Sequence, residues 1–115
     1  MSTPFEQIAS LDRLVHEPTR LAILTALSAC ERADFLFLQR ITGLTKGNLS
    51  SHLSKLEEAG LVEIEKRFVD KKTQTLARLT GTGKEAVGSY WKEMETLRKS
   101  ASGWLPGNLR PATSG

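Results

Sequence analysis

The sequence predicts a mainly α-helical fold that carries one small antiparallel β-hairpin. Up to Gly60, apolar residues recur every three to four positions, which is the period of a helix. The period then changes to two over residues 62–68, as in a strand with alternating faces, and a second run of this kind comes after it. With 115 residues, of which 39% are hydrophobic and 25% charged, the chain has the length and composition of one domain with one core.

The first three helices are defined by start and stop signals. An apolar stripe predicts a helix over residues 4–15, and a second helix is expected over 18–29, with Pro18 in its first turn. Asp34 is a candidate N-cap for a short third helix with the sequence FLFLQRIT. Gly43 is placed to end that helix in the left-handed conformation.

The fourth helix begins after a very tight turn. Thr45 is expected to cap a helix over residues 46–59, KGNLSSHLSKLEEA, and Gly60 repeats the glycine stop signal. A turn of three or four residues that contains glycine is typical of a helix-turn-helix unit. Any antiparallel helix pair could use the same turn, so the signal gains weight from the hairpin that comes next in the chain.

The hairpin and the last helix complete the chain. Residues 62–68 and 75–79 are the expected strands, and a last helix from Gly83 to about Ser100, capped by Thr82, comes after them. A helix-turn-helix followed by a two-stranded hairpin is a winged helix-turn-helix, in which the hairpin is the wing. The residues expected at the tip of the wing are Asp70, Lys71 and Lys72.

The fourth helix has one apolar face and one slim polar face. Leu49, Leu53 and Leu56 fall on one side, and the opposite arc carries only small or polar residues. A slim helix face rich in hydrogen-bonding groups suits the major groove of DNA. The chain also has a net charge of +3. Residues 45–79, which include this helix and the wing, have seven basic and five acidic residues, although a solvated face of mixed charge would give the same count. The wing residues expected to contact DNA are Arg67, Lys71 and Lys72.

Two motifs resemble a known family. HEPTRLAIL is similar to the segment that opens the winged-helix core of ArsR-type bacterial regulators, and NLSSHLSKLEEAGLVE resembles their recognition helix and first wing strand. The combination also resembles the MarR-like winged-helix regulators and covers residues from about 11 to 80. The resemblance implies a winged-helix fold, a homodimer and binding to double-stranded operator DNA. Carried over by position, the recognition-helix contacts are Lys46, Gly47, Asn48, Ser50, Ser51, His52 and Lys55.

The sequence departs from the metal-sensing members of that family. Those members place paired cysteines before the recognition helix, where this chain reads ADFLFLQR, and Cys30 is its single cysteine. We therefore expect no metal site and no cofactor. The sequence contains no Ser-His-acid arrangement, so we expect no enzymatic activity. Whether a small molecule acts as an effector stays open.

The terminal helices carry more apolar residues than the helix-turn-helix core needs. We expect a dimer interface there, although packing of the two terminal helices on one another within a monomer would also account for these residues. In a dimer, two recognition helices would lie ~34–36 Å apart and contact successive major grooves. The candidate interface residues are Phe5, Ile8, Leu11, Tyr90, Trp91, Met94 and Leu97.

The organisation of the chain is given by these elements. Residues 1–100 are expected to form the winged-helix domain, and residues 101–115 a loosely ordered tail. The chain has no apolar run long enough to cross a membrane and no secretion signal at its start, which favours a cytoplasmic protein. The predicted function is sequence-specific regulation of transcription by a homodimer. The alternative is a protein-interaction module that docks through Phe35, Phe37, Tyr90 and Trp91.

Overall fold

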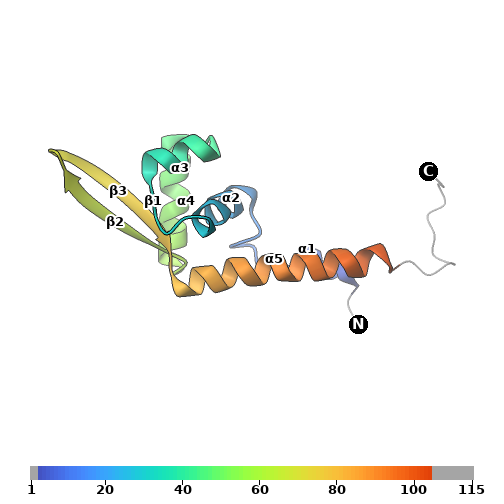
Figure 1. The fold of residues 1–115 in the computed structure, drawn as a ribbon. Coiled ribbons are helices and arrows are strands. Elements are labelled where there is room, and N and C mark those ends of the chain that lie inside the picture. The colour runs from blue at the N-terminus through green and yellow to red at the C-terminus, as the bar shows by residue number, and fades with distance from the viewer. Residues whose placement is uncertain (1–2, 105–115) are drawn as a thin grey trace.

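The computed structural model describes residues 3–104 and shows a helical body from which a hairpin projects (Figure 1). A long last helix runs along one side of the body and away from the hairpin. The fold class is therefore the one that the sequence predicts, a winged helix-turn-helix. The elements are α1 (Pro4–Ala9), α2 (Pro18–Ser28), β1 (Ala33–Asp34), α3 (Phe35–Thr42), α4 (Lys46–Glu58), β2 (Val62–Val69), β3 (Lys72–Leu79) and α5 (Gly81–Ser102).

The wing is a hairpin of two eight-residue strands joined by a two-residue turn. The antiparallel register runs from the Val62–Leu79 pair to the Val69–Lys72 pair. Asp70 and Lys71 form the turn, and both have positive φ, 49° and 64°. A turn with two positive φ angles matches the twist of the strands it joins. Lys72, expected at the tip, is instead the first residue of β3, because a two-residue turn leaves it paired with Val69.

A third strand, which the sequence did not predict, extends the sheet. β1 pairs antiparallel with β3, so the strand order is β1-β3-β2. It is only two residues long, and its partners, Leu76 and Ala77, lie more than 40 residues away in the chain. Such a strand is fixed by long-range pairing and leaves no alternation pattern in the sequence.

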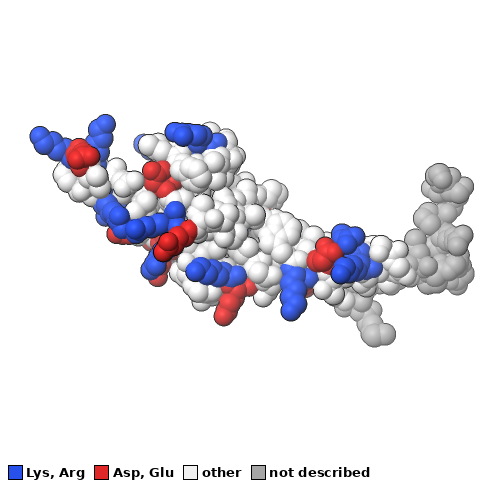
Figure 2. All heavy atoms as spheres, in the orientation of Figure 1, with Lys and Arg blue, Asp and Glu red and all other residues white. Residues whose placement is uncertain are grey.

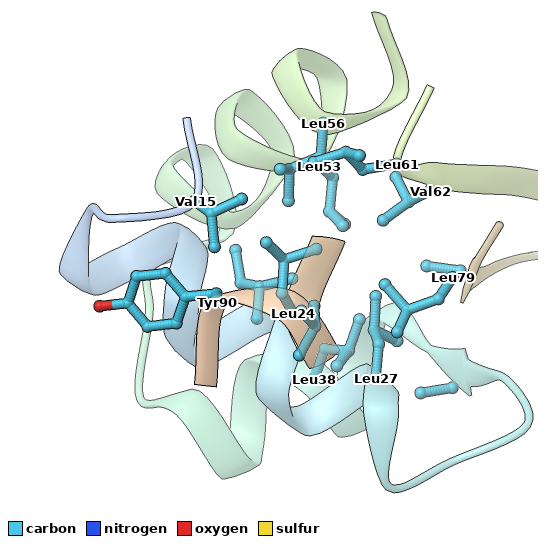
Figure 3. Packing of buried hydrophobic residues seen from close by; sticks show 14 of the residues in the cluster. Val15, Leu24, Leu27, Leu38, Leu53, Leu56, Leu61, Val62, Leu79 and Tyr90 are labelled. Carbon is cyan, nitrogen blue, oxygen red and sulfur yellow. The ribbon is translucent and has the colours of Figure 1, made fainter. Parts of the chain in front are cut away.

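The core lies where α2, α3, α4, the base of the wing and α5 meet (Figure 3). Leu49, Leu53 and Leu56, the predicted inner face of α4, are buried. They pack in one cluster with Leu24 of α2 and Leu38 of α3, both fully buried. This packing fixes which face of α4 remains in solvent.

The first helix is shorter than predicted. It ends at Ala9 rather than at residue 15. Beyond it, the Asp12 carboxylate accepts a hydrogen bond from the Leu14 N–H (2.9 Å), and the Arg20 side chain donates to the carbonyl oxygens of Arg13 and Leu14 (3.1 and 2.8 Å). Side chains that bond the backbone in this way offer it an alternative to a helix. The apolar stripe therefore predicted the burial of Leu11 and Val15 correctly, but its prediction that these residues are helical was wrong.

The last helix begins earlier than predicted, and its N-cap is Thr80 rather than Thr82. The Thr80 hydroxyl accepts from the Gly83 N–H (2.9 Å) and donates to the Gly60 carbonyl (2.6 Å), and the Thr80 N–H donates to the Leu61 carbonyl (3.0 Å). These bonds to the end of α4 select Thr80 as the cap. The helix continues to Ser102, past the predicted start of the tail at residue 101, and residues 105–115 of that tail lie outside the described part of the chain.

Candidate nucleic-acid interface

The turn between α3 and α4 has the geometry that the sequence predicts. The Asp34 carboxylate caps α3 by accepting from the Phe37 N–H (2.7 Å), and Gly43 ends it with φ of 72°. The Thr45 hydroxyl then caps α4 by accepting from the Asn48 N–H (3.2 Å). Three residues thus separate the two helices, which is the spacing of a helix-turn-helix.

The polar side of α4 is open to solvent. The seven residues on this side from Lys46 to Lys55 are exposed, and nothing lies within 4 Å of the position that a Cβ on Gly47 would take. The free N–H groups at the start of the helix add a positive partial charge there, next to Lys46. At the other end, Glu57 and Glu58 are exposed and place negative charge away from that start. We define the recognition face as Lys46, Gly47, Asn48, Ser50, Ser51, Ser54 and Lys55.

His52 lies behind the recognition face. Its side chain is half-buried, and the Nδ1 atom is buried with no hydrogen-bond partner among the residues that the structure describes. It faces the start of α2, where Glu17 accepts from the Arg20 N–H (2.7 Å). Desolvation raises the pKa of Glu17, but the N–H groups of Arg20 and Thr19 and the nearby His52 lower it below its usual value on balance. The half-buried side chain of His52 therefore lies at the edge of the core, and the DNA contact expected for this residue stays a prediction.

Cations gather at the outer end of the wing, whereas charges of both signs alternate along its base (Figure 2). Lys71 and Lys72 are exposed. Arg67 is engaged within the wing, because its side chain donates to both carboxylate oxygens of Glu65 (2.9 and 3.5 Å). The Arg67 hydrogen bond lowers the pKa of Glu65. Of the three predicted wing contacts, the two lysines are therefore available without breaking an ion pair.

Two hollows lie between the helix-turn-helix and the wing, and basic, hydroxyl, apolar and acidic side chains line them. A hollow of about 300 Å³ lies between Ser50 of the recognition face and Lys66 of β2. A second hollow of about 490 Å³ reaches Lys72, and Lys46 and Thr75 line both. Sequence reasoning missed Lys66 as an interface residue. Its alternation with Ile64, which also lines the first hollow, was the signal that could have placed it there.

The predicted dimer residues fall into two groups. Leu11, Tyr90 and Leu97 are buried within the single chain, where α1 and its following loop lie along α5. Ile8 and Met94 are half-buried against the same core. The remaining two, Phe5 and Trp91, are 48% and 46% exposed. Packing of the terminal helices within one chain thus accounts for the first group. Phe5 and Trp91 each contact one ring of the same chain, Trp104 and Tyr90, and keep about half of their surface in solvent.

Tyr90 is the centre of this packing. Its hydroxyl group lies 2.6 Å from Nδ1 of His16, and its ring meets that of Trp91 edge-on at 5.2 Å between centroids. Burial raises the pKa of the Tyr90 hydroxyl group.

Among the helices of residues 3–104, none has the length and apolar character that a membrane span requires.

These features define a winged-helix protein with an open recognition helix, and comparison with known proteins agrees. A family model described as a winged helix DNA-binding domain matches residues 19–97. The chain is 34% identical over 88 residues to the uncharacterized protein MJ0432 of Methanocaldococcus jannaschii, which covers 76% of this chain and 96% of that protein. The chain therefore belongs to the winged-helix DNA-binding domain family, a family of transcriptional regulators.

Solved structures show the same fold. The transcriptional regulator homologue of Pyrococcus horikoshii superposes with a TM-score of 0.77 at 28% identity, over 85% of this chain and 96% of that one. A variant of MarR from Escherichia coli superposes with a TM-score of 0.69 at 19% identity, over 91% of this chain and 75% of that one. The predicted likeness to MarR-like winged-helix proteins is thus confirmed for the fold.

Proposed function

We propose that this protein regulates transcription by binding a specific site on double-stranded DNA as a homodimer. The recognition face of α4 enters the major groove, and the wing lies on the adjacent backbone or minor groove. The observation that carries the proposal is the open recognition face, which nothing in the described chain covers. Three buried leucines, Leu49, Leu53 and Leu56, hold the opposite side of the same helix in the core.

Affinity and specificity come from different residues of this surface. Lys46, Lys55, Lys71 and Lys72 bind phosphates, which gives affinity for any sequence and a strong dependence on salt. Asn48 has an exposed amide, and an amide of this kind can pair with two atoms of adenine in the major groove. Ser50 and Ser51 lie beside it and supply hydroxyl groups that accept or donate.

The homodimer places two such surfaces on one DNA molecule. Phe5 and Trp91, left half-exposed by the packing of α1 on α5, are the residues that we place at the interface. Two recognition helices ~34–36 Å apart would then contact successive major grooves of a site with two-fold symmetry. Each protomer alone would bind weakly, because it makes half of the contacts.

The second candidate function is a protein-interaction module. Of the residues expected on its docking surface, Phe37 and Trp91 are exposed, whereas Tyr90 is buried and Phe35 half-buried. It is favoured by the exposed apolar side chains of α3, which are Leu36, Phe37 and Ile41. In this alternative the same surface would recruit a partner protein, and the basic wing would have no DNA to contact.

Selection of bound sequences from a random duplex library, followed by titration of the selected duplex, tests the proposal. Asn48→Ala is expected to cost about 1–3 kcal/mol of binding free energy on the selected duplex and little on random duplex. The matched control is Thr25→Ala, which shortens an exposed polar side chain on α2. It should change the affinity for neither the selected duplex nor the random duplex. Failure of the wild-type protein to bind any duplex at low salt would favour the protein-interaction module instead.

A further inference from the structure

Phe68 is the most exposed large apolar side chain in the described part of the chain. It is 76% exposed and lies two residues before the turn at the tip of the wing. Its cross-strand partner is Thr73, which leaves most of the ring in water. A Phe–Thr pair of this kind adds about 0.2–1 kcal/mol to a hairpin, so strand pairing gives only a small reason for an aromatic residue there.

Strand alternation assigns Phe68 to the face of β2 that is directed toward the recognition helix, and several lysines are close to it in the sequence. Because side chains alternate along a strand, Phe68 shares a face with Ile64 and Lys66, and these two residues line the hollow next to α4. Lys71 and Lys72 come within four residues, and Asp70 is the single acid between them and the ring. An exposed apolar ring on a lysine-rich wing tip matches a polyanion that also offers apolar surface.

The length of the wing matches the geometry of duplex DNA. Ile64 is the last residue of β2 that packs against the core, and Val69 at the outer end is five residues further on. At ~3.3 Å per residue, the free part of the wing extends about 16–17 Å. Half a helical turn of DNA is roughly 17 Å, so a wing beside a helix in the major groove reaches the neighbouring minor groove.

We propose that Phe68 is a specificity-determining residue that inserts its ring into the minor groove at a flexible base step. Apolar side chains that enter the minor groove push between neighbouring base pairs and partly unstack them. Pyrimidine–purine steps such as TA and CA unstack most readily, so the cost of insertion depends on the sequence beneath the wing. The inference rests on the proposed function and adds a second source of sequence preference, separate from the amide of Asn48.

The test uses the duplex obtained by selection, with 2-aminopurine placed in turn at the steps beneath the wing. Wild-type protein should raise the fluorescence of the probe at one step, because unstacking relieves its quenching. Phe68→Ala should abolish that rise and weaken binding about tenfold, which corresponds to ~1.4 kcal/mol. Replacing the flexible step by an A-tract should weaken wild-type binding by a similar factor and leave the variant nearly unaffected.

Two further variants separate insertion from a general effect of apolar surface. Phe68→Leu keeps an apolar wedge and should retain most of the affinity and the fluorescence rise. Ile41→Ala removes a half-exposed apolar group from α3, outside the wing and both hollows, and should match the wild type. Because Phe68 is so exposed, the variants should keep the wild-type circular dichroism spectrum and melting temperature.

Several outcomes would overturn the inference and leave the proposed function standing. One is tight binding of the selected duplex with no fluorescence change at any step. Another is a Phe68→Ala variant that binds this duplex as the wild type does. A third is a wild-type protein that binds anionic lipid vesicles and a Phe68→Ala variant that does not, while both bind the duplex equally. That result would assign the ring to a membrane surface. Absence of duplex binding by the wild-type protein would reject the proposed function itself, and the inference with it.

Discussion

Replacing Gly83 by alanine should destabilise the fold, because this glycine touches the backbone at the end of α4. A Cβ at position 83 would overlap the carbonyl oxygen of Leu61 and lie 3.0 Å from its carbonyl carbon and 3.2 Å from a methyl group of Leu79. The obstacle is backbone, and the hydrogen bond from the Thr80 N–H holds that carbonyl in place (3.0 Å). The chain must therefore shift rather than rotate a side chain.

The magnitude is the balance of three effects. Overpacking costs about 1–3 kcal/mol, and weakening the bond between the Gly83 N–H and the Thr80 hydroxyl costs about 1 kcal/mol more. Alanine returns at most about 1 kcal/mol through its higher helix propensity. The expected loss in the free energy of unfolding is thus about 2 kcal/mol. Gly81, two residues earlier in the same helix, has open space at its Cβ position, so Gly81→Ala should gain up to about 1 kcal/mol.

Thermal melts of the two variants at one protein concentration measure the difference. A gap of about 3 kcal/mol corresponds to roughly 12–24 °C between the two melting temperatures in a domain of this size. Circular dichroism at 222 nm monitors the helices, and the concentration is fixed because any dimer makes the melting temperature depend on it. A Gly83→Ala variant that melts as high as Gly81→Ala would refute the close approach of α5 to Leu61.

Three other perturbations test the charges and the surfaces. Lys71→Ala combined with Lys72→Ala should flatten the slope of log affinity against log salt by up to ~2. Arg67→Ala should change this slope less, because the Arg67 side chain is already paired with Glu65. Equal slopes for the wild type and all variants would show that the wing does not contact DNA. Trp91→Glu should shift the sedimentation of the protein from dimer to folded monomer, and an unchanged dimer would exclude this residue from the interface. Glu17 has a folded-state pKa below its usual value, so the stabilisation from its helix cap is present above the unfolded pKa and is lost as the pH falls through the folded pKa. In urea titrations from pH 7 to pH 3, Glu17→Gln should therefore lose less stability than the wild type. Equal losses of unfolding free energy in the two proteins would contradict this.

The helix-turn-helix could be predicted from sequence because its signals are local. Asp34 and Thr45 each cap a helix through an N–H three residues away, and Gly43 needs only its own left-handed conformation. Each signal acts within one turn of helix, so a short stretch of sequence contains both partners. The inward leucines of α4 follow the period of a helix, which is why the buried side and the exposed side of this helix could both be predicted.

The features that escaped prediction depend on how the chain folds, and the cap of α5 depends on partners far away in the chain. Thr80 and Thr82 are equal candidates for the cap of α5 by sequence, and the carbonyl groups of Gly60 and Leu61 decide between them. The ion pair that engages Arg67 could be foreseen as a spacing of two residues on one strand face, but its closure depends on the side-chain conformations of the folded wing. For the same reason the sequence placed Phe68 on a face of the strand without showing that nothing covers it.

The bonds around Leu61 also join the recognition helix to the helix that we place at the dimer interface. The Leu61 N–H donates to the carbonyl of Leu56 in the last turn of α4 (3.0 Å), while Thr80 binds the carbonyl groups of Gly60 and Leu61 from the start of α5. The end of α4, the base of the wing and the start of α5 are therefore one rigid unit. Because α5 has 22 residues and is about 33 Å long, a tilt of about 5° at its start moves its far end by about 3 Å. In the dimer that we propose, this junction would set the spacing of the two recognition helices. Gly83→Ala should therefore weaken binding to a two-site duplex more than to a single half-site, even at temperatures where the variant is fully folded. Equal weakening on both duplexes would show that the junction contributes to stability alone.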